Sequence, residues 1–554
     1  MKKFLKISGL SFLVMLIIGV IFFIVTALIF PPEPESLDSL ALERDSISAH
    51  HYKIGPNWVK KNEFGLYELY VEGKPFERGV IKGKLTKELV RKQEDFFIAQ
   101  IHELIPSKNY LRFLKYFVAW FNRDLDEYVP LEYQYEIYGV SESASDEYNY
   151  VGSKYQRMLN YHAAHDIGHA LQDKSLVGCT SFSVWGDKSE NKDLLVGRNF
   201  DFYVGDGFAE DKIIAFINPD SGHKFMMVTW GGMIGTLSGM NEKGLTVTIN
   251  AAKSDPPLSS ATPISIVARE ILQYASNIDE AYRLAASRKT FVSESILIGS
   301  QADGMTAIIE KSPGKISLVK SDENYIVCSN HYQSKEFEND SLNVKNIRES
   351  ASYYRHLRTD QLLKEKSSYN HSDFAAILRD RKGVNGAEIG MGNEKALNQL
   401  IAHHSIIFNP DKLLVWVSSN PMQLGAYVAY DLNKVFNLRD SIPQMVYEKD
   451  LTIAPDSFLF SDSFKDFKTF RKMRIEIKKA TKDKIMLDES VMENFLKLNP
   501  EYYETYWIAG DYYRIHQQMD KARGFYTEGL KKEIATMHER KKMEEGLALC
   551  NQSK

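Results

Sequence analysis

The sequence has 554 residues, of which 44% are hydrophobic and 26% are charged, and its formal net charge is −4. This length allows more than one domain, and the composition is that of an ordinary globular protein. The sequence has no excess of positive charge, and no long basic run appears beyond its first residues. We therefore predict no nucleic-acid partner.

An apolar segment opens the sequence. Lys2, Lys3 and Lys6 precede an uncharged stretch over residues 7–30. This length suits a helix that crosses a bilayer, and lysines before it favour a cytoplasmic N-terminus. We predict a single-pass transmembrane anchor over residues 1–30, with the rest of the chain on the extracytoplasmic side. A cleaved secretory signal is the alternative.

The next elements are predicted in chain order. Residues 31–178 form a linker and pro-region of mixed, largely helical character, with apolar residues at helical spacing over 84–104 and 110–125. From Gly178 the pattern changes to short β-rich runs between turns, over residues 179–185, 194–202, 213–217, 225–230 and 245–249. A helix that begins at Thr262-Pro263 follows, then hairpins over 296–327, helices over 346–405, and strands over 405–408 and 413–418. Antiparallel strands with segregated helices predict a layered α+β domain over residues 179–445.

Residues 446–554 form a charged tail that we predict to be helical. From Leu498 the tail resembles one tetratricopeptide (TPR) unit, because small and aromatic residues recur at that repeat's spacing: Tyr506, Ala509, Gly510, Tyr513, Ala522, Tyr526 and Gly529. About three such units are needed for a stable solenoid, so a helical hairpin packed on the main domain is the alternative. A TPR-like tail is also a candidate surface for a protein partner.

The cysteines direct attention to one position. Cys179, Cys328 and Cys550 are an odd and sparse set, which indicates no disulfide framework. At least one thiol therefore stays unpaired within the chain. Cys179 stands directly after Gly178, at the beginning of the first β-rich run.

Several short motifs follow in a fixed order. Gly178-Cys179-Thr180-Ser181 precedes Gly197-Arg198-Asn199-Phe200-Asp201-Phe202, and the turn Ser238 to Leu245 leads to Asn250. Cys328-Ser329-Asn330-His331 and Ser352-Tyr353-Tyr354-Arg355 come later. In order and spacing these motifs resemble the penicillin acyltransferase type of autoproteolytic cysteine hydrolase and its bile-salt hydrolase relatives. The resemblance extends from about residue 70 to residue 440.

The resemblance implies a four-layer αββα N-terminal-nucleophile fold and self-cleavage of the Gly178–Cys179 bond. The freed Cys179 then carries both a thiol nucleophile and an α-amine that serves as its base. Hydrolysis or transfer of a linear C–N amide through an S-acyl-enzyme needs no cofactor. We therefore predict an amidohydrolase or acyltransferase. Its predicted substrate is a small N-acyl amide, such as an N-acyl amino acid or a lipid amide near the membrane.

The same resemblance implies roles for the other motif residues. Arg198 favours the thiolate, and Asp201 holds the α-amine. Asn250 and Asn330 stabilise the oxyanion, a role in which one lost donor costs about 100- to 1000-fold in rate. The substrate-binding residues are Asn199 and Arg355.

Two other functions remain open at this stage. His162, His165 and His169 lie on one helical face, which suits a metal-dependent hydrolase. The glutamate of the H-E-x-x-H zinc motif is absent, so we predict no metal. The second alternative is a catalytically inactive, membrane-anchored scaffold that binds partners through its TPR-like tail.

Overall fold

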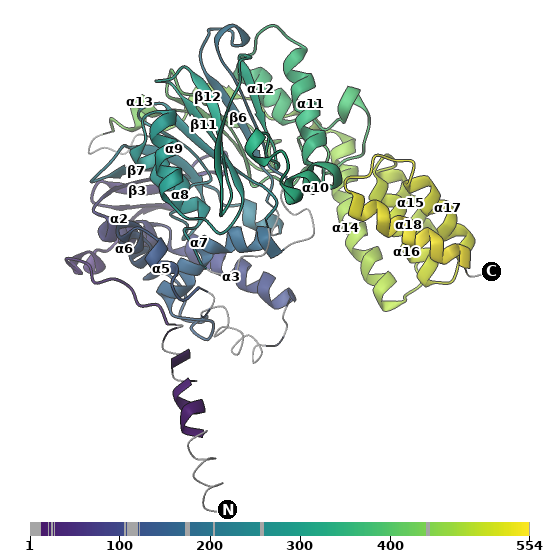
Figure 1. Ribbon diagram of the computed structural model, residues 1–554, viewed down its shortest axis with the longest axis horizontal. Helices are drawn as coiled ribbons and strands as arrows, with labels where there is room; N and C mark the ends of the chain where they lie inside the picture. Colours follow the sequence, from purple (N-terminus) through teal and green to yellow (C-terminus); the bar gives the residue numbers. More distant parts are fainter. Residues whose placement is uncertain are drawn as a thin grey trace, which may run out of the picture.

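The structure of the chain is a computed structural model (Figure 1). It describes residues 13–19, 22–23, 26, 28–104, 107, 120, 122–171, 178–202, 205–254, 260–438 and 444–552. The fold contains both helices and long antiparallel sheets, which confirms the predicted α+β class.

The larger sheet has eleven strands. Its neighbouring strands are antiparallel except for β4 and β7, which pair in parallel. In spatial order the strands are β1 (Asp45–Ser48), β2 (His51–Ile54), β3 (Asn57–Lys61), β4 (Tyr67–Gly73), β7 (Ile213–Pro219), β8 (Phe225–Thr229), β9 (Ser238–Asn241), β10 (Leu245–Ala251), β11 (Glu294–Ser300), β12 (Met305–Lys311) and β13 (Ile316–Lys320). The first four strands precede Cys179, so the upstream region is built into the same sheet as the downstream region.

The smaller sheet has seven strands. They are, in spatial order, β14 (Tyr325–Cys328), β5 (Thr180–Val184), β6 (Leu195–Phe200), β15 (His404–Asn409), β16 (Leu414–Ser418), β17 (Tyr427–Asp431) and β18 (Glu448–Ile453). Cys179 directly precedes β5, which lies between β14 and β6. The last strand, β18, extends this sheet beyond residue 445.

The two sheets face each other across a shared apolar layer that takes side chains from both, including Phe216 and Met240 from one and Phe408 and Val428 from the other. Helices α8 (Ile264–Tyr274) and α9 (Ile278–Ser287) cover the outer face of the larger sheet. On the smaller sheet, α11 (Ser352–Lys364) and α12 (His371–Leu378) take the equivalent place. Figure 1 shows these four layers edge-on, from α8 and α9 through β11 and β6 to α11 and α12.

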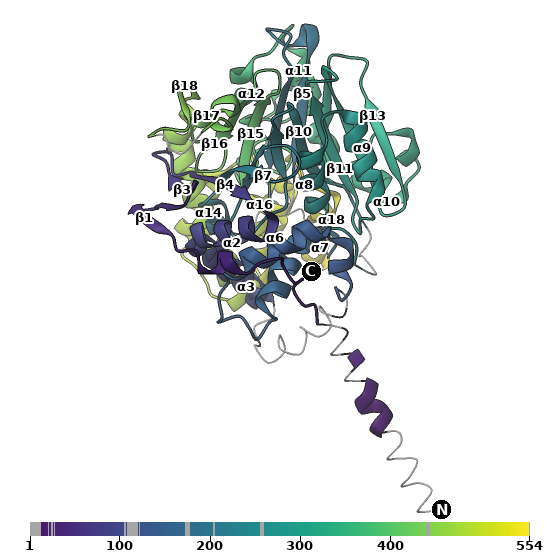
Figure 2. The ribbon, with the colours of Figure 1, turned by 90° about the vertical axis from the view of Figure 1, so that its left-hand side faces the viewer.

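The upstream helices pack closely on the downstream domain. They are α2 (Pro75–Leu85), α3 (Lys87–Leu104), α5 (Leu125–Tyr128), α6 (Leu131–Ser141) and α7 (Lys154–Leu171), of which α2, α6 and α7 lie side by side (Figure 2). The buried carboxylate of Glu136 pairs with Arg78 at 2.8 Å and with Arg269 of α8 at 3.1 Å. These contacts and the β4–β7 pairing join the two sides of the Gly178–Cys179 bond, so a cut there leaves both pieces held together.

Several predicted element boundaries differ from the structure. The sequence pattern indicated helices over residues 346–405, where the structure has α10 (Ser341–Glu349), α11 and α12 and then an irregular segment over 379–403. The prediction failed there because helical spacing of apolar residues also occurs in buried irregular backbone. The helix predicted over 110–125 lies mostly outside the described residues.

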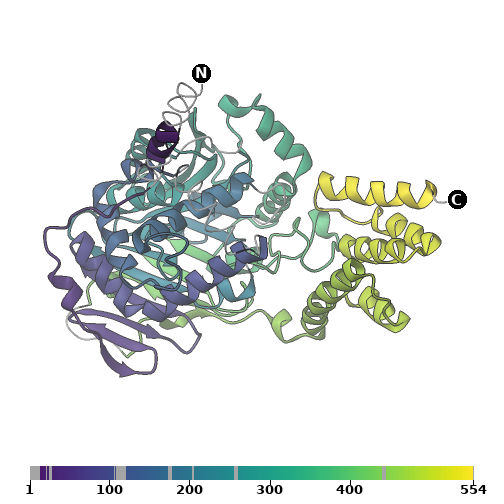
Figure 3. The ribbon, with the colours of Figure 1, turned by 90° about the horizontal axis from the view of Figure 1, so that it is seen from below.

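The C-terminal tail consists of α14 (Asp462–Asp483), α15 (Glu489–Leu498), α16 (Tyr503–Ile515), α17 (Met519–Gly529) and α18 (Met537–Gln552). These helices share their own apolar core and stand at one side of the main body (Figure 3). Leu400 and Leu424 of the main domain belong to the same core, and the Asn393 side chain donates a hydrogen bond to the Glu533 carbonyl at 2.8 Å. The tail is therefore packed on the segment that follows α12. The TPR assignment stays a prediction.

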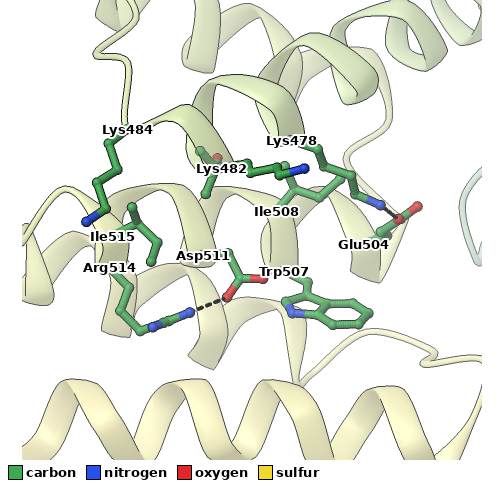
Figure 4. A pocket seen from close by; sticks show the side chains of 10 residues that line it. Lys478, Lys482, Lys484, Glu504, Trp507, Ile508, Asp511, Arg514 and Ile515 are labelled. Carbon is green, nitrogen blue, oxygen red and sulfur yellow. Dashed lines mark hydrogen bonds and ion pairs between the residues drawn. The ribbon is translucent and has the colours of Figure 1, made fainter. Parts of the chain in front are cut away.

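A groove of about 420 Å³ runs between α14 and α16 (Figure 4). Trp507, Ile508 and Ile515 give it apolar walls, and several basic side chains surround it, including Lys482. Glu504 pairs there with Lys478 at 2.6 Å. Whether a protein partner binds in this groove stays a prediction.

The predicted transmembrane anchor and the localisation derived from it are corrected by the structure. Nowhere in the part of the chain that the structure describes is a helix both long and apolar enough to cross a membrane. The helical residues described in the predicted span are 13–19, 22–23 and 26; residues 28–30 are described and not helical, and the other residues of the span lie outside the described part of the chain. The prediction rested on an uncharged stretch of sequence and the lysines before it, and the length of such a stretch does not fix the length of a helix. The extracytoplasmic placement of the catalytic domain therefore has no support.

Candidate active site

Cys179 lies where the β5–β6 hairpin brings two motifs together. The antiparallel register pairs Thr180 with Asn199 and Ser181 with Arg198. The ladder continues one step further, because the Gly178 N–H donates to the Asp201 carbonyl at 3.1 Å. The Cys179 side chain is 1% exposed and forms no disulfide bond. Local strand pairing thus places the cysteine between the arginine and the aspartate of the second motif.

Arg198 is a fully buried guanidinium beside the thiol. Its Nη2 lies 3.6 Å from the Cys179 Sγ, and its Nη1 donates to the Leu237 carbonyl at 2.7 Å and to the Ser238 Oγ at 2.5 Å. Nη2 also donates to the Ile249 carbonyl. Carbonyl and hydroxyl oxygens from β9 and β10 and the turn before them therefore hold the cation in place.

Burial favours the uncharged forms of both the thiol and the aspartate in the intact chain. Burial raises the pKa of the Cys179 thiol to about 11, although Arg198 acts in the opposite direction. Burial also raises the pKa of the Asp201 carboxyl to about 8, against the lowering effects of Arg355 and Arg198. Asp201 Oδ1 accepts no hydrogen bond from any described residue. The site thus places a buried cation beside two acids whose uncharged forms burial favours.

The raised pKa of Asp201 predicts a pH dependence of stability. In the unfolded chain this carboxyl titrates near pH ~4. Between that value and about 8 the folded chain keeps a proton that the unfolded chain releases. The contribution of Asp201 is therefore fully present below pH ~4 and is lost as pH rises, at up to about 1.4 kcal/mol per pH unit. We expect this decrease in the free energy of unfolding with rising pH in a Cys179→Ala variant, which lacks the thiol required for the predicted self-cleavage.

Urea unfolding between pH 5 and 8 measures this effect. The Cys179→Ala variant should lose free energy of unfolding relative to a Cys179→Ala/Asp201→Asn variant as pH rises, because asparagine does not titrate. The difference between the two variants isolates Asp201 from Lys82, a buried amine whose pKa desolvation lowers to about 7. Parallel curves for the two variants would contradict a raised pKa of Asp201.

The two predicted oxyanion asparagines are buried at the ends of β10 and β14, which belong to different sheets. Asn250 of β10 accepts a hydrogen bond from Ser181 at 2.9 Å, and its Nδ2 donates to the Cys328 carbonyl at 2.9 Å. Asn330 follows β14 and donates to the Ala251 carbonyl at 2.8 Å. Each amide nitrogen carries two N–H groups, so one bond to a carbonyl leaves a second donor for an oxyanion.

The two predicted substrate-binding residues have different surroundings. Arg355 of α11 donates to Asn330 Oδ1 at 2.6 Å and to Thr180 Oγ1 at 3.2 Å, so it lies next to the site. Asn199 points to the other side of β6, where its Nδ2 donates to the carbonyls of Leu378 and Leu397 at 2.8 and 2.9 Å. In this structure Asn199 ties β6 to the segment around α12.

Two further residues near Cys179 were not predicted from the sequence. Glu294 of β11 is fully buried and raises the pKa of the thiol by its charge. The Gln399 Nε2 donates to the Gly178 carbonyl at 2.7 Å and lies 3.4 Å from Asp201 Oδ2. Both residues lie more than a hundred positions from Cys179, and neither falls in a motif that would identify it.

The candidate metal site is only partly within the described residues. His162 is buried, its Nε2 accepts from the Ile234 N–H at 2.9 Å, and desolvation lowers its pKa to about 4. The side chains of His165 and His169 lie outside the described residues. Among the side chains that are described, no group of three His, Cys, Asp or Glu residues is placed to hold a metal ion.

Residues 188–418 match the model of the acyl-coenzyme A:6-aminopenicillanic acid acyl-transferase family. Over these residues the chain is similar to this acyltransferase family. The resemblance found in the sequence motifs is thereby confirmed, and the matched segment contains Arg198, Asp201, Asn250, Asn330 and Arg355. Gly178 and Cys179 precede it.

Two curated relatives cover a similar share of the chain. An uncharacterized protein of Archaeoglobus fulgidus is 27% identical over 285 residues, which are 47% of this chain and 46% of that protein. Protein dcd1A of Dictyostelium discoideum is 25% identical over 259 residues, which are 42% of this chain and 54% of that protein. The chain therefore matches about half the length of each relative.

Two solved structures are also similar to part of the chain. One is a Caenorhabditis elegans N-acylethanolamine-hydrolyzing acid amidase ortholog, with 16% identity, a TM-score of 0.31, and coverage of 42% of this chain and 93% of that one. The other is a mutant conjugated bile acid hydrolase from Clostridium perfringens, with 14% identity, a TM-score of 0.32, and coverage of 49% and 96%.

Proposed function

We propose that the chain is a self-processing N-terminal-nucleophile amidohydrolase or acyltransferase whose nucleophile is Cys179. The observation that carries this proposal is the position of Arg198 and Asp201 around the Gly178–Cys179 bond. The family match supports an enzyme that acts on amides. A binding protein or scaffold has no need for a buried cation beside an unpaired thiol.

The proposed reaction begins once the Gly178–Cys179 bond has been cut. The new α-amine of Cys179 takes the thiol proton, and the sulfur attacks the carbonyl carbon of the substrate amide. A C–S bond forms, the C–N bond breaks, and the amine leaves with the proton. Water or a second amine then attacks the S-acyl-enzyme and takes the acyl group.

Each neighbouring group has a proposed task in that cycle. Arg198 favours the thiolate, because its positive charge lowers the pKa of Cys179. Asp201 accepts a hydrogen bond from the α-ammonium through its unused Oδ1. The second amide N–H groups of Asn250 and Asn330 donate to the oxyanion. Arg355 contacts the substrate, and the contacts of Asn199 with backbone carbonyls favour a structural task for that residue.

The surroundings of the thiol favour an apolar acyl group. Cys179 belongs to the large apolar core on the helix side of the larger sheet, which also contains Phe208, Trp230 and Met233. An apolar acyl chain bound to the sulfur would leave water for this apolar core, which stabilises the S-acyl-enzyme. We therefore propose small N-acyl amides with an apolar acyl group as substrates.

Mass spectrometry of the purified full chain tests this proposal. We expect a fragment that begins at Cys179. After incubation with a panel of N-acyl amides of increasing acyl length and an acid quench, that fragment should gain the mass of one acyl group. A chelator should leave the reaction unchanged. An uncut chain without an adduct would instead support the inactive scaffold, and loss of activity with the chelator would support a metal hydrolase.

A further inference from the structure

The carbonyl of the bond to be cut already has a hydrogen-bond donor in the intact chain. The Gln399 side chain is 2% exposed, and its Nε2 donates to the Gly178 carbonyl oxygen at 2.7 Å. On the other side, the Gly178 N–H donates to the Asp201 carbonyl at 3.1 Å. No other side chain among the described residues donates to the Gly178 carbonyl. The junction is thus held between the end of β6 and one glutamine.

The backbone around Gln399 is fixed in a tight turn. The Asn398 N–H donates to the Asp380 carbonyl at 2.8 Å, and the Leu400 N–H donates to Asn398 Oδ1 at 3.0 Å. Leu400 has a φ of 56°, which is unfavourable for a residue with a side chain. Such a conformation persists only where its surroundings impose it, and Leu400 is fully buried in the apolar core shared with the tail. The packing around Leu400 therefore fixes the backbone position of Gln399.

We propose that Gln399 is a catalytic residue of the self-cleavage, in which it stabilises the oxyanion that forms on Gly178. This inference rests on the proposed function. The Cys179 sulfur attacks the Gly178 carbonyl carbon, and the thiol proton passes to the Cys179 nitrogen as the C–N bond breaks. Water then hydrolyses the thioester, which leaves a Gly178 carboxylate and the free thiol and amine of Cys179.

The contact at Gly178 suits this task better than the contacts of the other amides. In the first step, negative charge develops on the oxygen that Gln399 contacts. A preorganised donor aimed at such an oxygen is worth about 100- to 1000-fold in rate. Asn250 and Asn330 donate to other carbonyls in the intact chain, those of Cys328 and Ala251. They are therefore assigned to the substrate reaction and Gln399 to the processing reaction.

The hydrogen bond from Gln399 also explains why residue 178 is a glycine. A Cβ built on Gly178 would collide with the Gln399 side-chain amide, in particular with Nε2 and Oε1. Alanine at this position would therefore push the donor away from the carbonyl. Gly178 does not have a positive φ, so its backbone conformation alone does not require glycine. Glycine is required because the Gln399 side-chain amide occupies the space that a Cβ would need.

Processing kinetics of the full chain test the inference. The chain is made by pulsed cell-free synthesis, and the fragment that begins at Cys179 is followed by gel and intact mass. We expect Gln399→Ala to process about 100- to 1000-fold more slowly than the wild type. Gln423→Ala is the matched control, since Gln423 is equally buried and its side chain has no hydrogen-bond partner among the described residues. It should process at the wild-type rate.

Two further variants separate catalysis from support of the fold. Gln399→Glu should process faster as pH falls, because only the protonated carboxyl donates a hydrogen bond, and the wild type should lack this acid-side rise. Gly178→Ala should slow processing, and adding it to Gln399→Ala should cause little further loss, because both remove the same hydrogen bond.

The outcomes distinguish the inference from the function on which it rests. A wild type that is never cut overturns the proposed function, and the inference with it. A wild type that is cut, together with an equally fast Gln399→Ala variant, overturns the inference alone. If Gln399→Ala does not fold, the pH profile of Gln399→Glu decides, and a profile identical to that of the wild type overturns the inference.

Discussion

The Cys179→Ala variant is expected to remain a single chain of 554 residues and to lose all amidase or acyltransferase activity. The sulfur is the proposed nucleophile of both reactions, and removal of a covalent nucleophile typically costs about a million-fold in kcat. Cys179→Ser should retain slow processing at most, because a hydroxyl is a weaker nucleophile than a thiol. Intact mass, N-terminal sequence and a discontinuous amidase assay measure these outcomes.

Cys328→Ala is the matched control for this prediction. Cys328 is also buried and unpaired, and it lies on β14, next to the strand that follows Cys179. Burial raises the pKa of its thiol too, and its sulfur contacts the carbonyl of Ser329 at 3.8 Å. We expect Cys328→Ala to process and to turn over substrate. A Cys179→Ala protein that is still cut after Gly178 would reject Cys179 as the nucleophile.

Replacement of Arg198 should impair both stability and chemistry. In Arg198→Met, the buried carbonyl of Ile249 loses the Arg198 donor, at a cost of about 1–3 kcal/mol, whereas the carbonyl of Leu237 still accepts from the Ile249 N–H at 3.2 Å. The thiolate also loses the nearest positive charge, so the pKa of Cys179 should rise. We expect processing and turnover to fall at least about 100-fold. Thermal unfolding and processing rates measured on the same preparation separate the two effects.

Arg198→Lys tests the geometry of the cation. Lysine keeps the charge but not the planar fork that reaches the carbonyl of Leu237, the hydroxyl of Ser238 and the thiol together. This variant should therefore recover part of the activity that Arg198→Met loses, with a smaller rise in the pKa of Cys179. Equal activity of the lysine and methionine variants would show that the charge of Arg198 does not act on the thiol.

Short-range features of the site could be predicted from the sequence. Cys179, Arg198 and Asp201 lie in or next to consecutive β-rich runs, and strands that follow each other in the chain usually pair. The change from helical spacing to alternating β runs at Gly178 correctly marked the start of β5. Periodicity is a property of the segment itself, so it is visible in the sequence.

Long-range features could not be predicted in this way. The parallel pairing of β4 with β7 joins residues 67–73 to residues 213–219, and no pattern in either segment names its partner. The helices expected over 346–405 end at Leu378. The prediction extended too far because a buried irregular segment carries apolar residues at spacings that a helix also shows. The membrane span failed as a prediction for a related reason, since an apolar composition does not by itself establish a helix of spanning length.

The sequence by itself determined the α+β class, the family resemblance and the proximity of Cys179, Arg198 and Asp201. These features depend on local spacing and strand order. Only the tertiary structure decided what surrounds that junction. Gln399 and Glu294 reach it from distant segments, and burial sets the protonation of Cys179 and Asp201. Both effects arise from which segments pack together and exclude water, and chain folding fixes that for the whole molecule at once.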